Sequence, residues 1–394
     1  MRKGLRIIPV VVMVAVLAGC GSGDKASNDA GAGPTTVTSR DARAQQVVDA
    51  VRSVQAQYGS RAIVYGAWIE GKPLAVGAVG SALPGVPARP DQHFRIGVAA
   101  EWFLGTLLLR MADQHKVGLD DPIAKWYPRL PNAREVTLRM LANSSSGYND
   151  FVNTPAFSNA FAKNPFRQWR PDELIAIAMS KPPLFPPGTS WAFSDTNATI
   201  LGQILQRVSG KPLGTLYREN LFSKLGMNQT RANPNAIVPA PMLHGYESSR
   251  GVHEDSTNWT RTWVPGASNV TSTVGDLGRW VRGYGSVLSA RSRRLQTAPD
   301  LAGKGPLTRS NYYGFGTLVT NGWIAQNPQL AGYNGIAAYL PSKKLSFVAF
   351  TTLGPTTNPV VAAATAVFRK VAHALTPENI PAFSVLPRGT SGNQ

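Results

Sequence analysis

The order of the hydrophobic patterns along the chain most constrains its fold. Apolar runs typical of β-strands lie near both ends: 63–69, 74–79, 335–340 and 345–351. Between them, apolar residues recur at helical spacing, as in 99–116 and 196–208. Strands so far apart share one sheet only if the intervening chain forms an insertion. The sequence therefore predicts an α/β (α+β) fold, with an antiparallel sheet built from both termini, flanked by helices, and an inserted helical lobe.

Capping signals support the expected helices. Thr273 followed by Asp276 resembles a capping box, and Pro171 stands at the first position of another helix. Gly210 is typical of a residue that ends a helix. Further helices are expected over 41–58, 137–143 and 360–375.

The length and composition indicate a large folded core. The chain has 394 residues, of which 43% are hydrophobic and 16% charged. Because one compact core rarely exceeds about 250–300 residues, two lobes are expected. Cys20 is the single cysteine, so no disulfide can form within the chain. The five histidines lack metal-binding spacing, and we expect neither a metal nor a cofactor.

The first residues are typical of an export signal. Arg2, Lys3 and Arg6 precede an apolar run over 7–19 that is shorter than the roughly 20 residues of a membrane-spanning helix. This run ends in Leu-Ala-Gly-Cys at 17–20, which resembles a bacterial lipobox. We expect cleavage before Cys20 and acylation of its thiol with fatty acids such as palmitate, which would hold the protein on the cell membrane at its extracytoplasmic face.

These signals define the expected organisation of the chain. Residues 1–19 form the lipoprotein signal peptide, and residues 20–40, which are small and polar, form a flexible tether. The folded domain is predicted over 41–376. A flexible tail, rich in Pro, Gly and Ser, is predicted over 377–394.

The net charge restricts the expected partners. The chain has 40 Lys+Arg against 22 Asp+Glu, a formal charge of +18, and loss of the three basic signal residues leaves 37 against 22, or +15. Outside the cytoplasm, such a surface meets anionic lipids or cell-wall polymers. No nucleic-acid partner is expected.

Seven collinear strings carry a family resemblance. They are FRIG at 94–97, LDDPIAKWYP at 119–128, TLRMLANSSSGYNDF at 137–151, PPGTSWAFSDTNATILGQILQRVSGKPL at 186–213, LFSKLGM at 221–227, STVGDLGRW at 272–280 and YGFG at 313–316. Together they resemble the serine β-lactamase and penicillin-binding-protein superfamily, in its class C and D,D-carboxypeptidase branch. The resemblance implies a β-lactamase/transpeptidase-like fold.

The same resemblance exposes departures at the reacting positions. The family uses an SxxK serine and lysine, a YxN tyrosine and an HxG or KTG strand for acyl transfer. Here Val98 and Glu101 hold the SxxK places, Phe193-Ser194-Asp195 replaces YxN, and Ala325-Gln326-Asn327-Pro328 carries no HxG or KTG. Removal of the nucleophile costs about 10⁶-fold in kcat in subtilisin. No catalytic residue is therefore assigned, and we predict a pseudoenzyme.

The old catalytic pocket still offers candidate contacts for a ligand. The candidates that the resemblance places there are Glu101, Ser145, Phe193, Asp195, Asn327 and Tyr333. Glu101 and Asp195 would both face the cleft, where paired carboxylates could perform acid–base chemistry or bind a cationic group. Alternatively, each acid pairs with a nearby Lys or Arg, or Glu101 faces solvent. Ser145 belongs to a Ser-rich segment that is typical of a turn.

Three functions remain open from the sequence. The first is an extracytoplasmic lipoprotein that lacks serine acyl-transfer activity and binds peptidoglycan, another cell-wall component or an unidentified protein partner. The second is an active hydrolase (D,D-carboxypeptidase, β-lactamase or esterase) with a non-standard nucleophile. The third is a scaffolding lipoprotein that acts through its basic surface.

Overall fold

A computed structural model describes residues 36–37, 40–232, 237–260, 262–263, 270–357 and 362–382. The predicted signal peptide, Cys20, most of the tether and residues 383–394 of the tail lie outside the described residues. The predicted start of the last helix, at Val360, also lies outside them. All the elements below belong to one compact unit.

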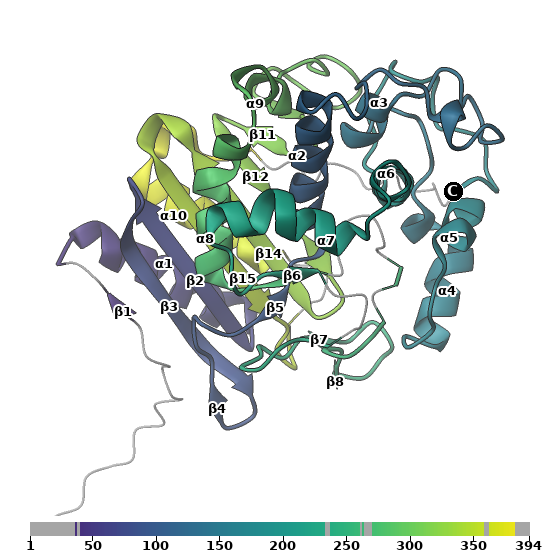
Figure 1. The fold of residues 1–394 in the computed structure, drawn as a ribbon. Helices are drawn as coiled ribbons and strands as arrows, with labels where there is room; N and C mark the ends of the chain where they lie inside the picture. The colour runs from purple at the N-terminus through teal and green to yellow at the C-terminus, as the bar shows by residue number, and fades with distance from the viewer. Residues whose placement is uncertain are drawn as a thin grey trace, which may run out of the picture. The chain divides into compact units, whose positions relative to one another are not determined.

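Strands from near both ends of the described chain form one antiparallel sheet (Figure 1). Its strands, in spatial order, are β1 (Thr36–Val37), β3 (Lys72–Leu83), β2 (Ala62–Ile69), β15 (Leu345–Thr352), β14 (Tyr333–Leu340), β12 (Trp323–Gln326), β11 (Leu318–Thr320) and β10 (Asn311–Tyr313). β2 and β15 pair along their full length, from Leu345 opposite Ile69 to Thr352 opposite Ala62. The predicted sheet, built from both termini, is confirmed.

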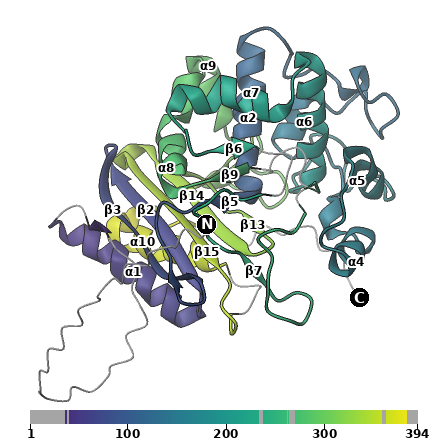
Figure 2. The same cartoon turned by 60° about the horizontal axis from the view of Figure 1, so that its bottom comes forward.

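Two helices cover one face of this sheet. α1 (Ala42–Tyr58) and α10 (Ala363–Leu375) lie together on the side opposite α8 (Val274–Gly283) (Figure 2). Side chains of β15 alternate between the two faces, so Phe347 packs with the α1/α10 core and Phe350 with the opposite core. Each face of the sheet therefore buries its own hydrophobic layer.

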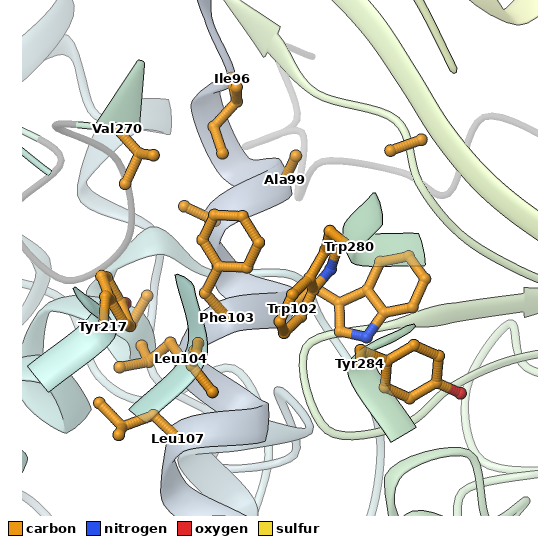
Figure 3. Close-up of a cluster of buried hydrophobic side chains, with 14 of the residues drawn as sticks. Ile96, Ala99, Trp102, Phe103, Leu104, Leu107, Tyr217, Val270, Trp280 and Tyr284 are labelled. Carbon is orange, nitrogen blue, oxygen red and sulfur yellow. The ribbon is translucent and has the colours of Figure 1, made fainter. Parts of the chain in front are cut away.

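The middle of the chain supplies the inserted helices. They are α2 (Ala100–Asp113), α3 (Leu138–Ala142), α4 (Pro155–Lys163), α5 (Pro171–Ala178), α6 (Asp195–Ser209), α7 (Leu213–Tyr217) and α9 (Ala290–Gln296). α2 is buried along almost its whole length. Its Trp102 and Phe103 lie against Trp280 and Tyr284 (Figure 3), with the Phe103 and Trp280 ring centroids 4.5 Å apart and nearly perpendicular.

The capping signals mark the helix ends. The Thr273 hydroxyl accepts a hydrogen bond from the Asp276 backbone N–H at 3.3 Å, and Gly210 ends α6 with φ +68°. The Asp276 carboxylate accepts from Gln229 and Thr230, so the reciprocal bond of a capping box is not seen among the described contacts. α4 was not predicted, although Thr154 caps it and Pro155 opens it. Its nine residues are too few for apolar periodicity to identify it.

The turn that follows β10 positions the site. β10 stops at Tyr313, and Gly316 adopts φ +66°. A Cβ atom on Gly316 would lie 2.0 Å from the Glu101 carbonyl oxygen of α2. Only glycine allows this approach, which brings Tyr313 beside the first turn of α2.

We expect Trp280→Ala to lower the free energy of unfolding by about 3–5 kcal/mol, because it empties a buried aromatic site against α2. Urea denaturation measures this change. Phe166→Ala is the matched control: Phe166 is 59% exposed, so its loss should stay within about 0.5 kcal/mol. Similar losses for the two variants would contradict the assignment of Trp280 to the core around α2.

Candidate functional site

The start of α2 holds no nucleophile. A short 3₁₀ turn, Gly97–Ala99, leads into the helix, and Gly97 adopts φ +53°. Val98, at the serine place of the resembled motif, is buried with 8% of its surface exposed. Its side chain carries only methyl groups, so it can neither attack a carbonyl nor transfer a proton.

One helical turn later, Glu101 enters a buried hydrogen-bond network. The Tyr313 hydroxyl donates to Glu101 Oε2 at 2.9 Å. Gln326 Nε2, at the end of β12, donates to the Tyr313 hydroxyl at 2.9 Å and to the Gly316 carbonyl at 2.8 Å. Glu101, Tyr313 and Gln326 are all buried. The Glu101 side chain is thus turned inward, not to solvent.

Tyr313 is the electrostatic centre of this network. Burial raises the pKa of its phenol well above the usual 10, and the nearby Glu101 and Asp195 carboxyls raise that pKa further. The phenol therefore stays protonated and acts as a hydrogen-bond donor. The Phe193 ring lies 6.5 Å from the Tyr313 ring, edge to face. Tyr313 thus lies near the buried Glu101 and Asp195 carboxyls and the half-buried Phe193 ring.

The start of α6 fixes the segment that replaces YxN. Ser194 precedes the helix, and its hydroxyl donates to the Asn149 carbonyl at 3.1 Å. Asp195 is the first helical residue, where the positive end of the helix dipole stabilises a carboxylate. Both residues are buried. Ser194 therefore has a visible structural role, which connects α6 to the neighbouring loop.

The Ser-rich segment after α3 is a rigid turn. Ser144 adopts φ +59°, and the Ser145 hydroxyl donates to Asn143 Oδ1 at 2.7 Å. The Ser146 hydroxyl donates to Asn197 Oδ1 at 2.6 Å, which ties the turn to α6. All three serines are buried. The Ser145 and Ser146 hydroxyls are thus engaged in holding the turn, whereas Ser144 lines a small cavity beside Glu101.

The cavity beside Glu101 that the described residues line is very small. Its volume is about 10 Å³, with room for about one water molecule, and its lining includes Glu101, Ser144 and Ser194. The segment after β12 also lies close to the start of α2: a Cβ atom on Gly97 would lie 3.2 Å from the side chains of Pro328 and Leu330. Glu101 and Asp195 are both buried, and Asp195 is not among the described lining residues of this cavity.

A second, larger cavity is lined in part by β13 (Gln329–Leu330). Its volume is about 500 Å³, and its aromatic walls are Phe157, Phe161, Trp259, Trp263 and Tyr333. The Tyr333 hydroxyl donates to the Leu243 carbonyl at 2.7 Å, and burial raises the pKa of Tyr333 to about 12.

The structure therefore places the predicted ligand-contact residues in different parts of the domain. Tyr333 belongs to the larger cavity, whereas Glu101, Phe193 and Asp195 surround Tyr313. Ser145 lies within its own turn. Asn327 is half-buried and lines neither of these two cavities among the described residues.

Sequence reasoning missed several of the site residues. Tyr313 belongs to the recognised YGFG string and Gln326 to the altered third motif, but nothing in the sequence pairs them. The aromatic wall had a faint signal: Phe157 and Phe161 are four residues apart, which places them on one face of a helix.

Among the described residues, no group of three or more His, Cys, Asp or Glu side chains could hold a metal ion. In the same part of the chain, no helix has both the length and the apolar character needed to cross a membrane.

Comparisons with known proteins agree with this architecture. The family model described as Beta-lactamase matches residues 47–372. The chain is 27% identical over 222 residues to a D-aminopeptidase of Cereibacter sphaeroides, a match that covers 56% of this chain and 41% of that protein. It is 28% identical over 223 residues to the D-alanyl-D-alanine-carboxypeptidase/endopeptidase AmpH of Escherichia coli, with 55% of each chain covered. The chain thus spans about half the length of these curated relatives.

Solved structures give the same fold. The D-amino acid amidase of Ochrobactrum anthropi SV3, complexed with L-phenylalanine amide, superposes with a TM-score of 0.75 at 20% identity, covering 86% of this chain and 99% of that one. A D-stereospecific amidohydrolase from Streptomyces sp. gives a TM-score of 0.74 at 22% identity, covering 85% and 99%.

We expect Tyr313→Phe to lower the free energy of unfolding by about 1–3 kcal/mol, because it removes the hydroxyl that connects the buried Glu101 and Gln326 side chains. Thermal or urea denaturation measures the loss. Tyr312→Phe is the control, since the half-buried Tyr312 hydroxyl donates only to the Thr297 carbonyl. An equal or larger loss for Tyr312→Phe would contradict a central structural role for the Tyr313 network.

Proposed function

The chain belongs to the Beta-lactamase family, and from that premise we propose that it is an extracytoplasmic lipoprotein whose β-lactamase-like domain lacks serine acyl-transfer activity. The domain binds a cell-wall-related ligand or a protein partner in place of catalysis. The relatives named above are hydrolases by name, so the proposed loss of activity is specific to the residues of this chain.

One observation carries the proposal. Val98, just before α2, and the buried Glu101, in its first turn, stand where acyl transfer needs a serine and a lysine. The Tyr313 hydroxyl donates to Glu101, which makes the side chain part of the protein interior. A lysine in the family supplies a base one turn after the nucleophile, and a carboxylate engaged in this way is poorly placed to deprotonate an attacking group. The proposed loss of acyl transfer therefore involves both the nucleophile and the base, and not one residue alone.

The alternative of an active hydrolase with another nucleophile receives no support from the nearby serines. The Ser145 hydroxyl donates within its turn, and the Ser194 hydroxyl donates to a backbone carbonyl. Neither lies within hydrogen-bond distance of a histidine or lysine side chain among the described contacts. An activated serine needs such a base.

The proposed location rests on the N-terminal sequence. The lipobox-like end at Cys20 and the +15 charge of the processed chain, 37 basic against 22 acidic residues, both favour attachment near anionic membrane and wall polymers. A relative of 24% identity is named a teichoic acid D-alanine hydrolase of Staphylococcus aureus, which supports a cell-wall setting for the ligand.

We expect the purified protein to form no covalent adduct with labelled penicillin or with a fluorophosphonate. Val98→Ser should still give no nitrocefin turnover, because the lysine base and the YxN tyrosine remain absent. Intact-protein mass spectrometry and absorbance measure the two outcomes. An active D-aminopeptidase serves as the positive control for the reagents. An adduct on the unaltered protein, or turnover by Val98→Ser, would refute the proposed loss of acyl transfer.

We expect Cys20→Ala to abolish incorporation of labelled palmitate and to move the protein from the membrane fraction to the soluble extracytoplasmic fraction. The physical reason is that a lipid anchor gains about 0.8 kcal/mol per buried CH₂, which no other predicted feature replaces. Membrane association that survives both this change and high salt would rule out anchoring at Cys20.

A further inference from the structure

The larger cavity is lined by residues of α4, of β7 (Tyr246–Glu247) and the turn to β8 (Glu254–Asp255), and of β13. Figure 2 shows where α4, β7 and β13 lie in the fold. Val98, Glu101, Phe193 and Asp195 are not among its described lining residues. Its volume of about 500 Å³ falls within the range of roughly 300–1,000 Å³ typical of small-molecule sites.

The lining combines aromatic rings with neutral hydrogen-bonding groups. Nine of its described residues carry a neutral hydroxyl or amide side chain other than tyrosine: Ser60, Ser158, Asn159, Ser249, Gln329, Asn334, Thr351, Thr352 and Thr357. Among the described lining residues, only Glu247 and Arg250 are charged, and their formal charges cancel. The described part of the lining thus has no net charge, in a chain with a formal charge of +18. This balance favours a ligand that is neutral, has apolar faces and carries several hydrogen-bonding groups.

Both charged groups already have partners within the protein. Arg250 Nη1 lies 3.4 Å from Glu254 Oε2, and the guanidinium lies 5.9 Å from the Trp259 ring centroid. Glu247 Oε1 accepts hydrogen bonds from the backbone N–H groups of Ser248 and Ser249, at 3.0 and 3.2 Å. A charged ligand would have to displace these contacts.

Phe161 lies at the centre of the aromatic wall. Its ring centroid is 5.7 Å from that of Trp259 and 5.6 Å from that of Trp263, both edge to face, and 5.7 Å from that of Phe157 in a stacked arrangement. The Phe161 side chain is half-buried. Flat aromatic faces of this kind suit a ring that presents C–H groups on one side and polar groups at its edge.

We propose that this cavity binds a neutral sugar, with a pyranose ring packed against the aromatic wall around Phe161 and its hydroxyl or amide groups bonded to the neutral polar side chains. The inference rests on the proposed binding role and names its ligand class. Of the nine neutral polar side chains, Asn334, Thr351 and Thr357 already bond within the protein. An acyl chain would leave the other six without ligand partners, at a cost in desolvation. A phosphate or carboxylate would meet Glu247 and a single, already paired arginine.

The test uses N,N′-diacetylchitobiose as the neutral sugar, decanoate as the acyl chain and inorganic phosphate as the anion. Each is titrated into the full-length protein and followed by calorimetry and tryptophan fluorescence. We expect saturable binding of the disaccharide alone. Phe161→Leu, which keeps an apolar side chain but removes the ring, should weaken binding about tenfold, a factor that corresponds to about 1.4 kcal/mol. Phe161→Tyr, which keeps the ring, is the matched control and should bind within about twofold of the unaltered protein.

A second variant keeps the sugar assignment testable if Phe161→Leu does not fold. Gln329 is exposed on β13 and lines the cavity, so Gln329→Ala should fold normally and weaken disaccharide binding about threefold or more if its amide bonds to the sugar. Absence of disaccharide binding, equal binding by Phe161→Leu and Phe161→Tyr, or saturable binding of decanoate or phosphate would each overturn the sugar assignment.

The result is distinguishable from failure of the proposed function. A protein that forms no penicillin or fluorophosphonate adduct and binds no disaccharide keeps the proposed loss of acyl transfer but loses the sugar site. A protein that forms an adduct yet binds the disaccharide with the expected Phe161 dependence keeps the sugar site and loses the proposed inactivity.

Discussion

The pairing of β2 with β15 is the constraint on which the rest of the structure depends. It joins Ala62–Ile69 to Leu345–Thr352 through eight residue pairs, although the two strands lie at opposite ends of the folded chain. Closing so long a loop costs conformational entropy, which the two buried faces of the sheet offset. This pairing encloses the middle of the chain, whose helices lie on the side of the sheet opposite α1 and α10. There α8 packs on β2, β14 and β15, and α2 is the buried central helix.

The burial of α2 then determines the chemistry available at its start. Gly105 and Gly316 allow the helix and the 313–316 turn to approach until backbone contacts backbone. This approach places Tyr313 against Glu101. A lysine at that position would need a solvated or paired environment for its ammonium group, whereas a carboxylate can accept the Tyr313 hydrogen bond. The packing and the altered motif are therefore mutually consistent.

The sheet and the long helices could be predicted from the sequence because their signals are local. Alternation in 345–351, helical spacing in 99–116 and caps such as Thr273 depend on neighbouring residues. The site could be predicted only in part, since its contacts join distant segments: Tyr313 and Glu101 are 212 residues apart. Family strings led us to expect Glu101, Phe193 and Asp195 in one pocket, but they gave no reason to expect Tyr313 between them or the burial of both acids.

An acyl-transferring enzyme must hold its substrate and present a nucleophile to it in the same cleft. In this domain, the altered catalytic positions and the larger cavity are two different places. Here the position of the nucleophile is filled by Val98, and the cavity beside Glu101 has room for about one water molecule. The cavity of about 500 Å³ that β13 lines has aromatic walls, and the charges of its described lining residues balance. Because recognition needs complementary shape and hydrogen bonds but no activated group, a domain with this division can lose acyl transfer and still retain a specific ligand.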